Sequence, residues 1–497
     1  MDRPQKLVVI GAGPVGALAA LYGAQRGYEV EIYELRPDLR DKKSIPLNFT
    51  KSINLALSER GIHALRQAGR PEILEDVMRG AIPMRGRMIH GQTSSGDLFD
   101  DAQDYDIFGR TIFAADRNEL NSKLLDKLLG LPNVKVFFNH KLTGVDFKAC
   151  KAWLEVKDQF LANGRHKEIE IDFDFMIGAD GAHSATRYHI MKFARVDYQQ
   201  EFIDTMWCEF RMEAVEKPAN DAFESKFRIS PYHLHIWPGR DFMFIAIPNE
   251  DGSFTCTLFM PQKHFTDLEA NPAKLTSFFD THFPGVRNHI PDEALYRSFK
   301  ENPHLPLISI KCKPYHFGSS GVILGDAAHA MVPFYGQGMN AGFEDVRILF
   351  SILDKHAELD EPNSPTDVVS VSSPAAQRAQ ALAEYSAVRA PDAHSINDLA
   401  INNYIEMRSS VLSRTYRLRK WLEEFMSVHF SSFGWQTKYS RVTFSSERYS
   451  QIVAQNNHQS MMLMRCVMGL AASPLVISGL VLAYRCRRAL SGGFLGR

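Results

Sequence analysis

The start of the chain alternates short apolar runs with one helix-like stretch. Leu7–Ile10 predicts a strand, Gly11–Gly27 predicts a tight turn followed by a helix, and Glu29–Tyr33 predicts a second strand. This strand–helix–strand order implies a parallel sheet. Further apolar runs predict that the same sheet takes strands from separated parts of the chain, at Val134–Phe138, Phe175–Gly178 and Gly321–Leu324.

The middle of the chain has a different pattern. Short β-rich runs are separated by the turn residues Pro238–Gly239 and Asn249–Gly252. Such runs joined by short turns predict an antiparallel sheet in a second domain. The runs are Leu234–Trp237, Met243–Pro248 and Phe254–Met260.

The last part of the chain predicts helices and a membrane anchor. Residues Ala379 to Glu424 are rich in Ala, Leu, Arg and Glu, which favours helix. Residues 354–376 are rich in Pro, Ser and acidic residues and predict a surface loop. The run from Cys466 to Tyr484 carries no charge, and its length is close to the roughly 20 residues that a spanning helix needs. Arginines flank this run, so we expect an anchor, with an amphipathic or buried helix as the alternative.

Composition narrows the class of protein. Apolar residues make up 45% and charged residues 23%, as in an ordinary globular protein. The formal net charge of -1 does not favour a nucleic-acid binder. The six cysteines form no C-x-x-C pair, so we expect no metal site and a reducing compartment. The polar residues before Leu7 do not resemble a secretory signal.

The first glycine motif follows the first predicted strand directly. In Gly11-Ala12-Gly13-Pro14-Val15-Gly16 the three glycines permit a tight turn, a close approach of a pyrophosphate and helix packing. The pyrophosphate then lies at the helix N-terminus. Glu34 ends the second strand, where an acid accepts ribose hydroxyls. Arg36 is interpreted as a surface residue or a contact to the adenosine.

Two later motifs complete the pattern. The segment from Asp174 to Gly181 predicts a strand that ends in Gly-Ala-Asp-Gly, and Ser184 and Arg187 follow it. The segment from Gly325 to Asn340 contains Asp326 after a strand and a glycine-rich loop that opens a helix. The N–H groups of such a helix stabilise the negative charge of a reduced flavin. His329 in this segment is either catalytic or packed beside the loop.

These three motifs, in this order, resemble the single-component FAD-dependent aromatic hydroxylases. The resemblance implies non-covalent FAD, NADPH as co-substrate and hydroxylation by O2 through a hydroperoxide on the flavin. A second nucleotide-binding segment is absent from the sequence pattern, as in that family. The positions that match its cofactor contacts are Gly11, Gly13, Val15, Gly16, Tyr33, Glu34, Leu35, Arg36, Ala56, Arg117, Leu142, Asp180, Ala185, Asp326, Gly338, Met339 and Asn340.

A narrower resemblance concerns the substrate. Five segments are similar to members of the family that hydroxylate an aromatic amino acid. There Arg87 matches the arginine that pairs with the substrate carboxylate, and Tyr105, Asn403 and Tyr439 match its other contacts. A guanidinium binds a carboxylate through two hydrogen bonds, and from chemistry alone Arg85 is an equal candidate. The segments are Ser52–Ser58, Met84–His90, Leu234–Pro238, Phe254–Pro261 and Asn403–Arg408.

The expected function is therefore an NADPH-dependent hydroxylase in which no residue is assigned as general acid or base. The alternatives are hydroxylation of another aromatic carboxylate, a membrane-tethered flavin reductase of the same fold, and a non-enzymatic docking platform. The resemblance points to the mitochondrial outer membrane, with the catalytic domains facing the cytosol. Small molecules and the membrane are the expected partners, with no nucleic acid.

The predicted fold is α/β, with a Rossmann-like FAD-binding domain, an antiparallel substrate domain and a C-terminal helical region. The FAD-binding domain is expected in three parts, the substrate domain in two. The expected boundaries are 1–84, 111–195 and 306–353 for FAD binding, 85–110 and 196–305 for the substrate domain, 354–376 for the loop, 377–455 for the helical region and 461–488 for the anchor with its basic flank.

Overall fold

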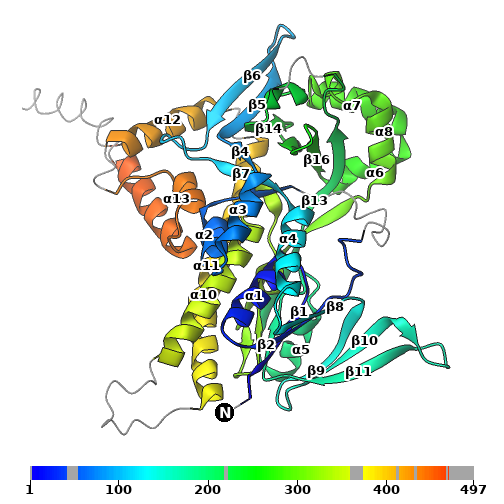
Figure 1. Cartoon of the computed structure of the whole chain (residues 1–497). Coiled ribbons are helices and arrows are strands. Elements are labelled where there is room, and N and C mark those ends of the chain that lie inside the picture. The colour runs from blue at the N-terminus through cyan, green and yellow to red at the C-terminus, as the bar shows by residue number, and fades with distance from the viewer. Residues whose placement is uncertain are drawn as a thin grey trace, which may run out of the picture.

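Figure 1 shows the computed structural model of the chain, with two sheets stacked along its length and helices on their outer faces. The structure describes residues 3–41, 54–217, 222–358, 373–409, 413–429, 434–465 and 468. The predicted segment Ser52–Ser58 is therefore described from Asn54 onward.

A mainly parallel sheet forms the core of the lower half in Figure 1. Its strands pair in parallel, except for a short antiparallel pair at one edge. The buried strand residues match the apolar runs in the sequence, and helix α1 (Pro14–Gln25) packs against them. The strand order is β18 (His316–Phe317), β19 (Gly321–Ile323), β12 (Phe175–Gly178), β1 (Lys6–Ile10), β2 (Glu29–Tyr33) and β8 (Val134–Phe137).

The larger second sheet lies above the first. The predicted runs Met243–Pro248 and Phe254–Met260 are strands with the expected bounds. The three predicted runs pair antiparallel, as expected. The sheet departs from the antiparallel pattern at one junction, where Leu234 pairs in parallel with Arg87. That junction joins segments far apart in sequence, which no turn pattern encodes. The strand order is β17 (Leu305–Lys313), β13 (Asp197–Met212), β16 (Phe254–Met260), β15 (Met243–Pro248), β14 (His233–Pro238), β5 (Gly86–Gln92) and β6 (Leu98–Asp104).

Helices cover the outer face of this second sheet. Aromatic side chains such as Phe210, Phe244, Phe279 and Phe283 form the apolar core between the two layers. Edge-to-face ring contacts run through this core. The covering helices are α6 (Gln262–Ala270), α7 (Leu275–His282) and α8 (Asp292–Glu301).

Two smaller three-stranded sheets accompany the main ones. One is the antiparallel meander of β9 (His140–Asp146), β10 (Lys151–Phe160) and β11 (His166–Asp172), which projects from the lower half. The other joins β3 (Asn54–Leu57), β7 (Ile112–Asp116) and β4 (Ile82–Met84). The helices next to these sheets are α2 (Glu59–Arg66), α3 (Pro71–Arg79), α4 (Arg117–Leu129) and α5 (Ala185–Phe193).

Long helices support both halves from one side. Helix α10 (Gly338–Glu358) and helix α11 (Pro374–Arg408) run side by side, followed by α12 (Arg414–His429), α13 (Lys438–Phe444) and a helix over residues 449–465. The loop predicted over 354–376 is shorter in the structure at both ends, because α10 continues to Glu358 and α11 begins at Pro374. Ser373 caps α11 by accepting from the N–H of Ala376, which explains the early start. Residues 359–372 lie outside the described residues.

The predicted anchor lies almost wholly beyond the described part of the chain. Of the run Cys466–Tyr484, only Met468 is described. Among the described residues, no helix is both long and apolar enough to cross a bilayer.

Candidate active site

A cavity of about 250 Å³ opens where the first sheet meets the helices. The start of α1, the turn after β12 and the start of α10 all reach it. Ala56 and Arg117, two predicted cofactor contacts outside the glycine motifs, also line it. Its lining is Gly13, Pro14, Val15, Asn54, Leu55, Ala56, Arg117, Ala179, Gly181, Leu324, Asp326, Met331, Pro333, Gly336, Gly338 and Met339.

The first glycine motif shapes one wall of this cavity. Gly11 has a φ of 98°, and a Cβ there would lie 2.5 Å from the carbonyl oxygen of Ala179. A Cβ on Gly16 would lie 1.9 Å from the carbonyl oxygen of Gly11. A Cβ on Gly13 would meet nothing within 4 Å. The outer glycines therefore close the turn, while Gly13 leaves the backbone open to a ligand at the N-terminus of α1.

Glu34 lies at the end of β2, where the sequence pattern places a ribose acceptor. Its buried carboxylate accepts from the N–H of Ala12 at 2.8 Å. It also pairs with Arg36, whose Nε lies 2.7 Å away. Arg36 is thus held beside the expected ribose position. Of the flanking predicted residues, Tyr33 is buried and stacks on Phe137, whereas Leu35 is 47% exposed.

Asp180 takes a role that the sequence pattern did not indicate. Its carboxylate accepts from the Ser184 hydroxyl at 2.5 Å and from the Thr186 N–H at 2.9 Å. Burial raises the pKa of this carboxyl, against the lowering effect of those hydrogen bonds. The side chain thus holds the turn that leads into α5, and the backbone at Ala179 and Gly181 lines the cavity.

Ala185 and Leu142, two further predicted cofactor positions, carry apolar side chains and are absent from the lining of the cavity. Ala185 is the first residue of α5, and Leu142 is buried in the core on β9. The backbone near Leu142 is nonetheless tied to the site, because the N–H of His140 donates to the carbonyl of Glu34 at 2.8 Å.

The third motif forms the opposite wall of the cavity. Asp326 is exposed between buried neighbours and makes no hydrogen bond or ion pair within the described residues. Asn340 is fully buried and ties the start of α10 to β3, accepting from the Ser58 N–H at 2.9 Å and donating to the Ala56 carbonyl at 2.7 Å. His329 is also fully buried, with Nε2 2.6 Å from Asp345. Of the two interpretations of His329, the structure favours packing.

These residues fit FAD. Two helix N-termini, at Pro14 and Gly338, present backbone N–H groups to one cavity and favour anionic groups there. The carboxylate of Asp326 faces the same space, and Glu34, at the end of β2, accepts from Ala12 in the first glycine turn. Carboxylates are acceptors for sugar and ribityl hydroxyls, so both ends of a flavin dinucleotide find matching groups.

A second cavity, of about 320 Å³, adjoins the second sheet. Its volume falls within the range of roughly 300–1,000 Å³ that is usual for small-molecule sites. Arg87 on β5 projects into it and is 6% exposed. The Arg87 guanidinium carbon lies 5.0 Å from the ring centre of Tyr439 and 5.9 Å from that of Tyr105. The structure thus brings three of the four predicted substrate residues together.

A third tyrosine joins this cluster, and the sequence analysis missed it. Tyr439 stacks on Tyr105 at 5.1 Å and on Tyr335 at 5.6 Å between ring centres. Burial raises the pKa of each hydroxyl, so all three stay protonated at neutral pH. The Tyr335 hydroxyl is buried and has no hydrogen-bond partner within the described residues. Tyr335 ends the 3-10 turn η5 (Pro333–Tyr335), so this turn lines the cofactor cavity at Pro333 and packs at its other end on Tyr439 of the second cavity.

The fourth predicted residue, Asn403, lies behind the wall of the second cavity. It is buried on α11, and its amide donates to the carbonyl of Phe334 at 2.7 Å, which fixes the turn before Tyr335. Its helix neighbours Asn402 and Glu406 line the cavity instead. Spacing by four residues places these two on one helix face, a signal already present in the sequence.

Several charged residues line the cavity besides Arg87, and two of them, Glu406 and Lys420, interact with it. Glu406 lies 3.5 Å from Arg87. Lys420 on α12 also lines the wall, and burial, followed by the like charge of Arg87, lowers the pKa of its ammonium group. Arg85, the other candidate for the carboxylate, is exposed and donates to the Nε2 of His233 at 3.3 Å. It is absent from the lining, so Arg87 is the better placed of the two.

Comparison with known proteins agrees with this site. The family described as FAD binding domain matches residues 5–384, which makes the chain a flavoprotein of the FAD-binding class. Kynurenine 3-monooxygenase of Neurospora crassa is 60% identical over 100% of this chain and 96% of its own length. The enzyme of the same name from Chaetomium globosum is 62% identical over 94% of this chain and 97% of its own. The chain belongs to the kynurenine 3-monooxygenase family.

Solved structures share the fold at low sequence identity. Pseudomonas aeruginosa PqsL in complex with 2-aminobenzoylacetate has a TM-score of 0.59 at 18% identity, covering 82% of this chain and 97% of that one. Klebsiella pneumoniae HpxO complexed with FAD and uric acid has a TM-score of 0.56 at 19% identity, covering 84% and 92%. These similarities support the α/β FAD-binding monooxygenase architecture.

Proposed function

We propose that the chain hydroxylates L-kynurenine to 3-hydroxykynurenine, a step of tryptophan degradation on the route to NAD. One NADPH, one proton and one O2 are consumed, and NADP+ and one water are released with the product. The observation that carries this proposal is the buried Arg87 beside the stacked rings of Tyr105 and Tyr439, in a cavity near the FAD cavity.

Arg87 is the group for the substrate carboxylate. Its guanidinium is almost fully buried, and a buried cation is stabilised by an anionic partner. Glu406 at 3.5 Å partly neutralises it in the structure. A substrate carboxylate brings a second anion, and the protonated hydroxyls of Tyr105 and Tyr439 are suited to donate to it.

The ring chemistry needs little acid or base help from the protein. The redox chemistry would come from FAD held in the first cavity, which would pass electrons from NADPH to O2. The aromatic amino group of kynurenine makes its ortho carbon nucleophilic, so no residue is assigned as general acid or base. The chain holds the ring and excludes water, and the buried aromatic side chains of Tyr335 and Phe334 between the cavities serve the second purpose.

Oxygen and NADPH consumption, measured together with product formation, tests this function. We expect L-kynurenine to stimulate both and to yield 3-hydroxykynurenine. Anthranilate and 4-hydroxybenzoate are the comparison substrates, and hydroxylation of either in preference to kynurenine would assign the chain another aromatic carboxylate. NADPH oxidation that needs no oxygen would favour a flavin reductase of the same fold.

We also propose that the C-terminal residues 461–488 anchor the enzyme in the mitochondrial outer membrane, with the catalytic domains in the cytosol. The uncharged run Cys466–Tyr484 and its flanking arginines support this anchor, since arginine side chains reach the headgroups from helix ends. The helix that precedes it ends in exposed methionines, Met461, Met462 and Met464. The choice of membrane comes from the family resemblance.

A neighbouring helix adds further support for a membrane surface. On α12, Trp421, Phe425 and Val428 are 58%, 42% and 52% exposed. Their spacing by four and three residues places them on one helix face. Glu423 of α12 and Leu463 of the last helix line one pocket, so the two helices are neighbours. An apolar face beside an anchor is suited to lie on lipid.

A further inference from the structure

The segment of residues 438–450, here called the C-terminal strap, contacts the loop that opens helix α10. Tyr449 of the strap is fully buried, and its hydroxyl donates to the Oε1 of Gln337 at 3.1 Å. Gln337 is itself 3% exposed and directly precedes Gly338, which lines the FAD cavity. One hydrogen bond thus separates the strap from the cofactor wall.

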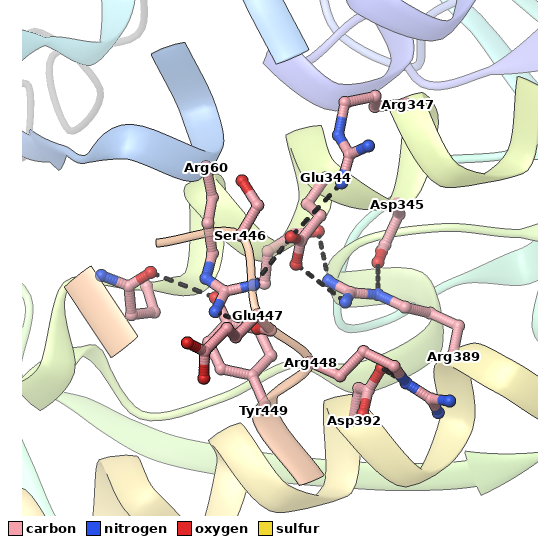
Figure 2. Close-up of polar contacts among 12 residues, drawn as sticks. Arg60, Glu344, Asp345, Arg347, Arg389, Asp392, Ser446, Glu447, Arg448 and Tyr449 are labelled. Carbon is pink, nitrogen blue, oxygen red and sulfur yellow. Dashed lines mark hydrogen bonds and ion pairs between the residues drawn. The ribbon is translucent and has the colours of Figure 1, made fainter. Parts of the chain in front are cut away.

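Arg60 of α2 fixes the strap from its inner side. Its Nε donates to the carbonyl of Val442 at 3.1 Å and its Nη2 to that of Glu447 at 2.5 Å. Its guanidinium carbon lies 3.8 Å from the ring centre of Tyr449. Figure 2 shows Arg60 between Glu447 and Tyr449 of the strap and Glu344 of α10. Arg60 therefore holds both the backbone of the strap and the ring of Tyr449.

Buried ion pairs continue from Arg60 toward the cofactor by a second route. Glu344 accepts from Arg60 at 2.7 Å and from Arg389 at 2.8 Å. The Nε of Arg389 donates to Asp345, as Figure 2 shows. The other carboxylate oxygen of Asp345 accepts from the N–H of Gly325 at 2.8 Å. Gly325 directly precedes Asp326 in the FAD cavity, so the network reaches both loops of the third motif.

Burial makes this network rigid. Each of the four charged side chains is at most 2% exposed. A buried charge that loses its partner is strongly destabilised, so such a cluster has few alternative arrangements. A shift of the strap would therefore disturb Gln337 through Tyr449, and Gly325 through the ion pairs that begin at Arg60.

We propose that the C-terminal strap is part of the FAD site, with Tyr449 as a positioning residue for the Gln337–Gly338 turn and Arg60 as a positioning residue for Tyr449. The turn begins α10, and its backbone N–H groups face the cavity where the flavin binds. Without the strap, the Gln337 side chain loses the shorter of its two hydrogen bonds and keeps the 3.5 Å bond to the Ser58 hydroxyl. The proposal rests on the FAD site of the proposed function and not on the identity of the substrate.

Titration of FAD-depleted protein with FAD tests this proposal, with Tyr449→Phe as the variant. The change removes one hydroxyl and keeps the ring over Arg60. We expect the dissociation constant for FAD to rise about fivefold or more, the size of one net hydrogen bond. The fraction of NADPH oxidation that yields hydroxylated product should fall as well, because the flavin is held less accurately.

Tyr22→Phe is the matched control. Tyr22 is 2% exposed, and its hydroxyl donates to the carbonyl of Ala64 at 2.8 Å, with no contact to the cofactor cavity. This variant loses a comparable buried hydrogen bond and should lower thermal stability to a similar extent, while its FAD affinity stays that of the unmodified protein. Equal FAD affinities in Tyr449→Phe and Tyr22→Phe would overturn the proposal.

A double-mutant cycle identifies the route. In a Gln337→Met background, Tyr449→Phe should cause no further loss of FAD affinity, because its partner is already gone. Independent, additive losses would show that Tyr449 does not act through Gln337. FAD titration needs no substrate, so a wrong substrate assignment would leave these results unchanged.

Discussion

The Nε of Arg389 lies 2.5 Å from a carboxylate oxygen of Asp345, and both side chains are fully buried. Burial raises the pKa of the Asp345 carboxyl, but His329 and Arg389 outweigh this and hold it below its usual value. The pair is therefore ionised at neutral pH. Removing one partner leaves the other as an uncompensated charge.

Asp345→Asn should accordingly lower the free energy of unfolding by about 3–5 kcal/mol. Chemical denaturation in the presence of saturating FAD measures this loss. Asp354→Asn provides the control, since Asp354 pairs with Arg26 at 2.6 Å but is 42% exposed. An exposed pair contributes about 1 kcal/mol or less, so equal losses in the two variants would contradict the buried-network interpretation.

Arg87→Ala should raise the KM for kynurenine about 30-fold or more and leave the KM for NADPH nearly unchanged. Loss of the guanidinium strands the substrate carboxylate among buried aromatic rings, at a cost of a few kcal/mol. Steady-state kinetics with each substrate varied in turn gives both constants. Arg85→Ala is the control, because Arg85 is exposed and contacts His233 instead. A large KM effect in Arg85→Ala alone would move the carboxylate site there.

Tyr335→Phe should weaken kynurenine binding several-fold without loss of stability. The hydroxyl is buried and has no hydrogen-bond partner within the described residues, so the folded enzyme loses nothing when it is removed. A bound substrate would supply that partner from its own polar atoms. Thermal unfolding and the kynurenine KM together test this. A lower melting temperature with an unchanged KM would mean that the hydroxyl serves the fold.

The enzyme should lose stability as the pH falls below about 6.5, in part through His235. Burial lowers the pKa of His235 to about 3, and its ring is bonded to His90 and to the Ser230 carbonyl. Between pH 6.5 and about 3 the unfolded chain binds a proton that the folded chain does not. The stability contribution is thus complete above pH 6.5 and declines by up to about 1.4 kcal/mol per pH unit below it.

Denaturant unfolding at pH 7, 6 and 5 measures that slope. Glutamine does not titrate in this pH range, so His235→Gln should reduce the dependence of stability on pH. Burial also lowers the pKa of His90, so part of that dependence should remain. Identical slopes for the variant and the unmodified protein would rule out His235 as a source.

Truncation before Met461 should move the protein from the membrane pellet to the soluble fraction. The change removes the uncharged run and its flanking arginines but leaves Tyr439 and Tyr449 in place. Fractionation with alkaline carbonate measures the outcome. If carbonate released the full-length protein, the C-terminal helix would be a peripheral membrane helix and not a spanning one.

The sequence predicted best what depends on local pattern. The turn at Gly11 and the strands β2, β12, β15 and β16 follow from glycine spacing and short apolar runs. Arg87 was assigned only through family resemblance, because the sequence alone does not reveal whether an arginine side chain is buried. The cavity then distinguished it from Arg85.

What the sequence could not predict comes from contacts between distant segments. The parallel pairing of β5 with β14 and the approach of Lys420 to Arg87 both depend on packing. Asp180 was expected at the cofactor, and the motif did not indicate that its side chain also accepts from the Ser184 hydroxyl and the Thr186 N–H. Glu406 lay within a segment that resembles the family. Its spacing of four residues from Asn402 places both on one helix face, so the sequence could have predicted Glu406 as a cavity residue.

The burial of Arg60 beneath Val442 and Glu447 has a consequence for synthesis on the ribosome. Arg60 belongs to an early helix, but the carbonyl groups that accept its hydrogen bonds are translated nearly four hundred residues later. The nascent chain therefore leaves Arg60 without these two acceptors until translation is almost finished, although its partner Glu344 on α10 is made earlier. A buried cation without its acceptors is costly, so we expect α2 to reach its final packing only after the C-terminal residues have been made.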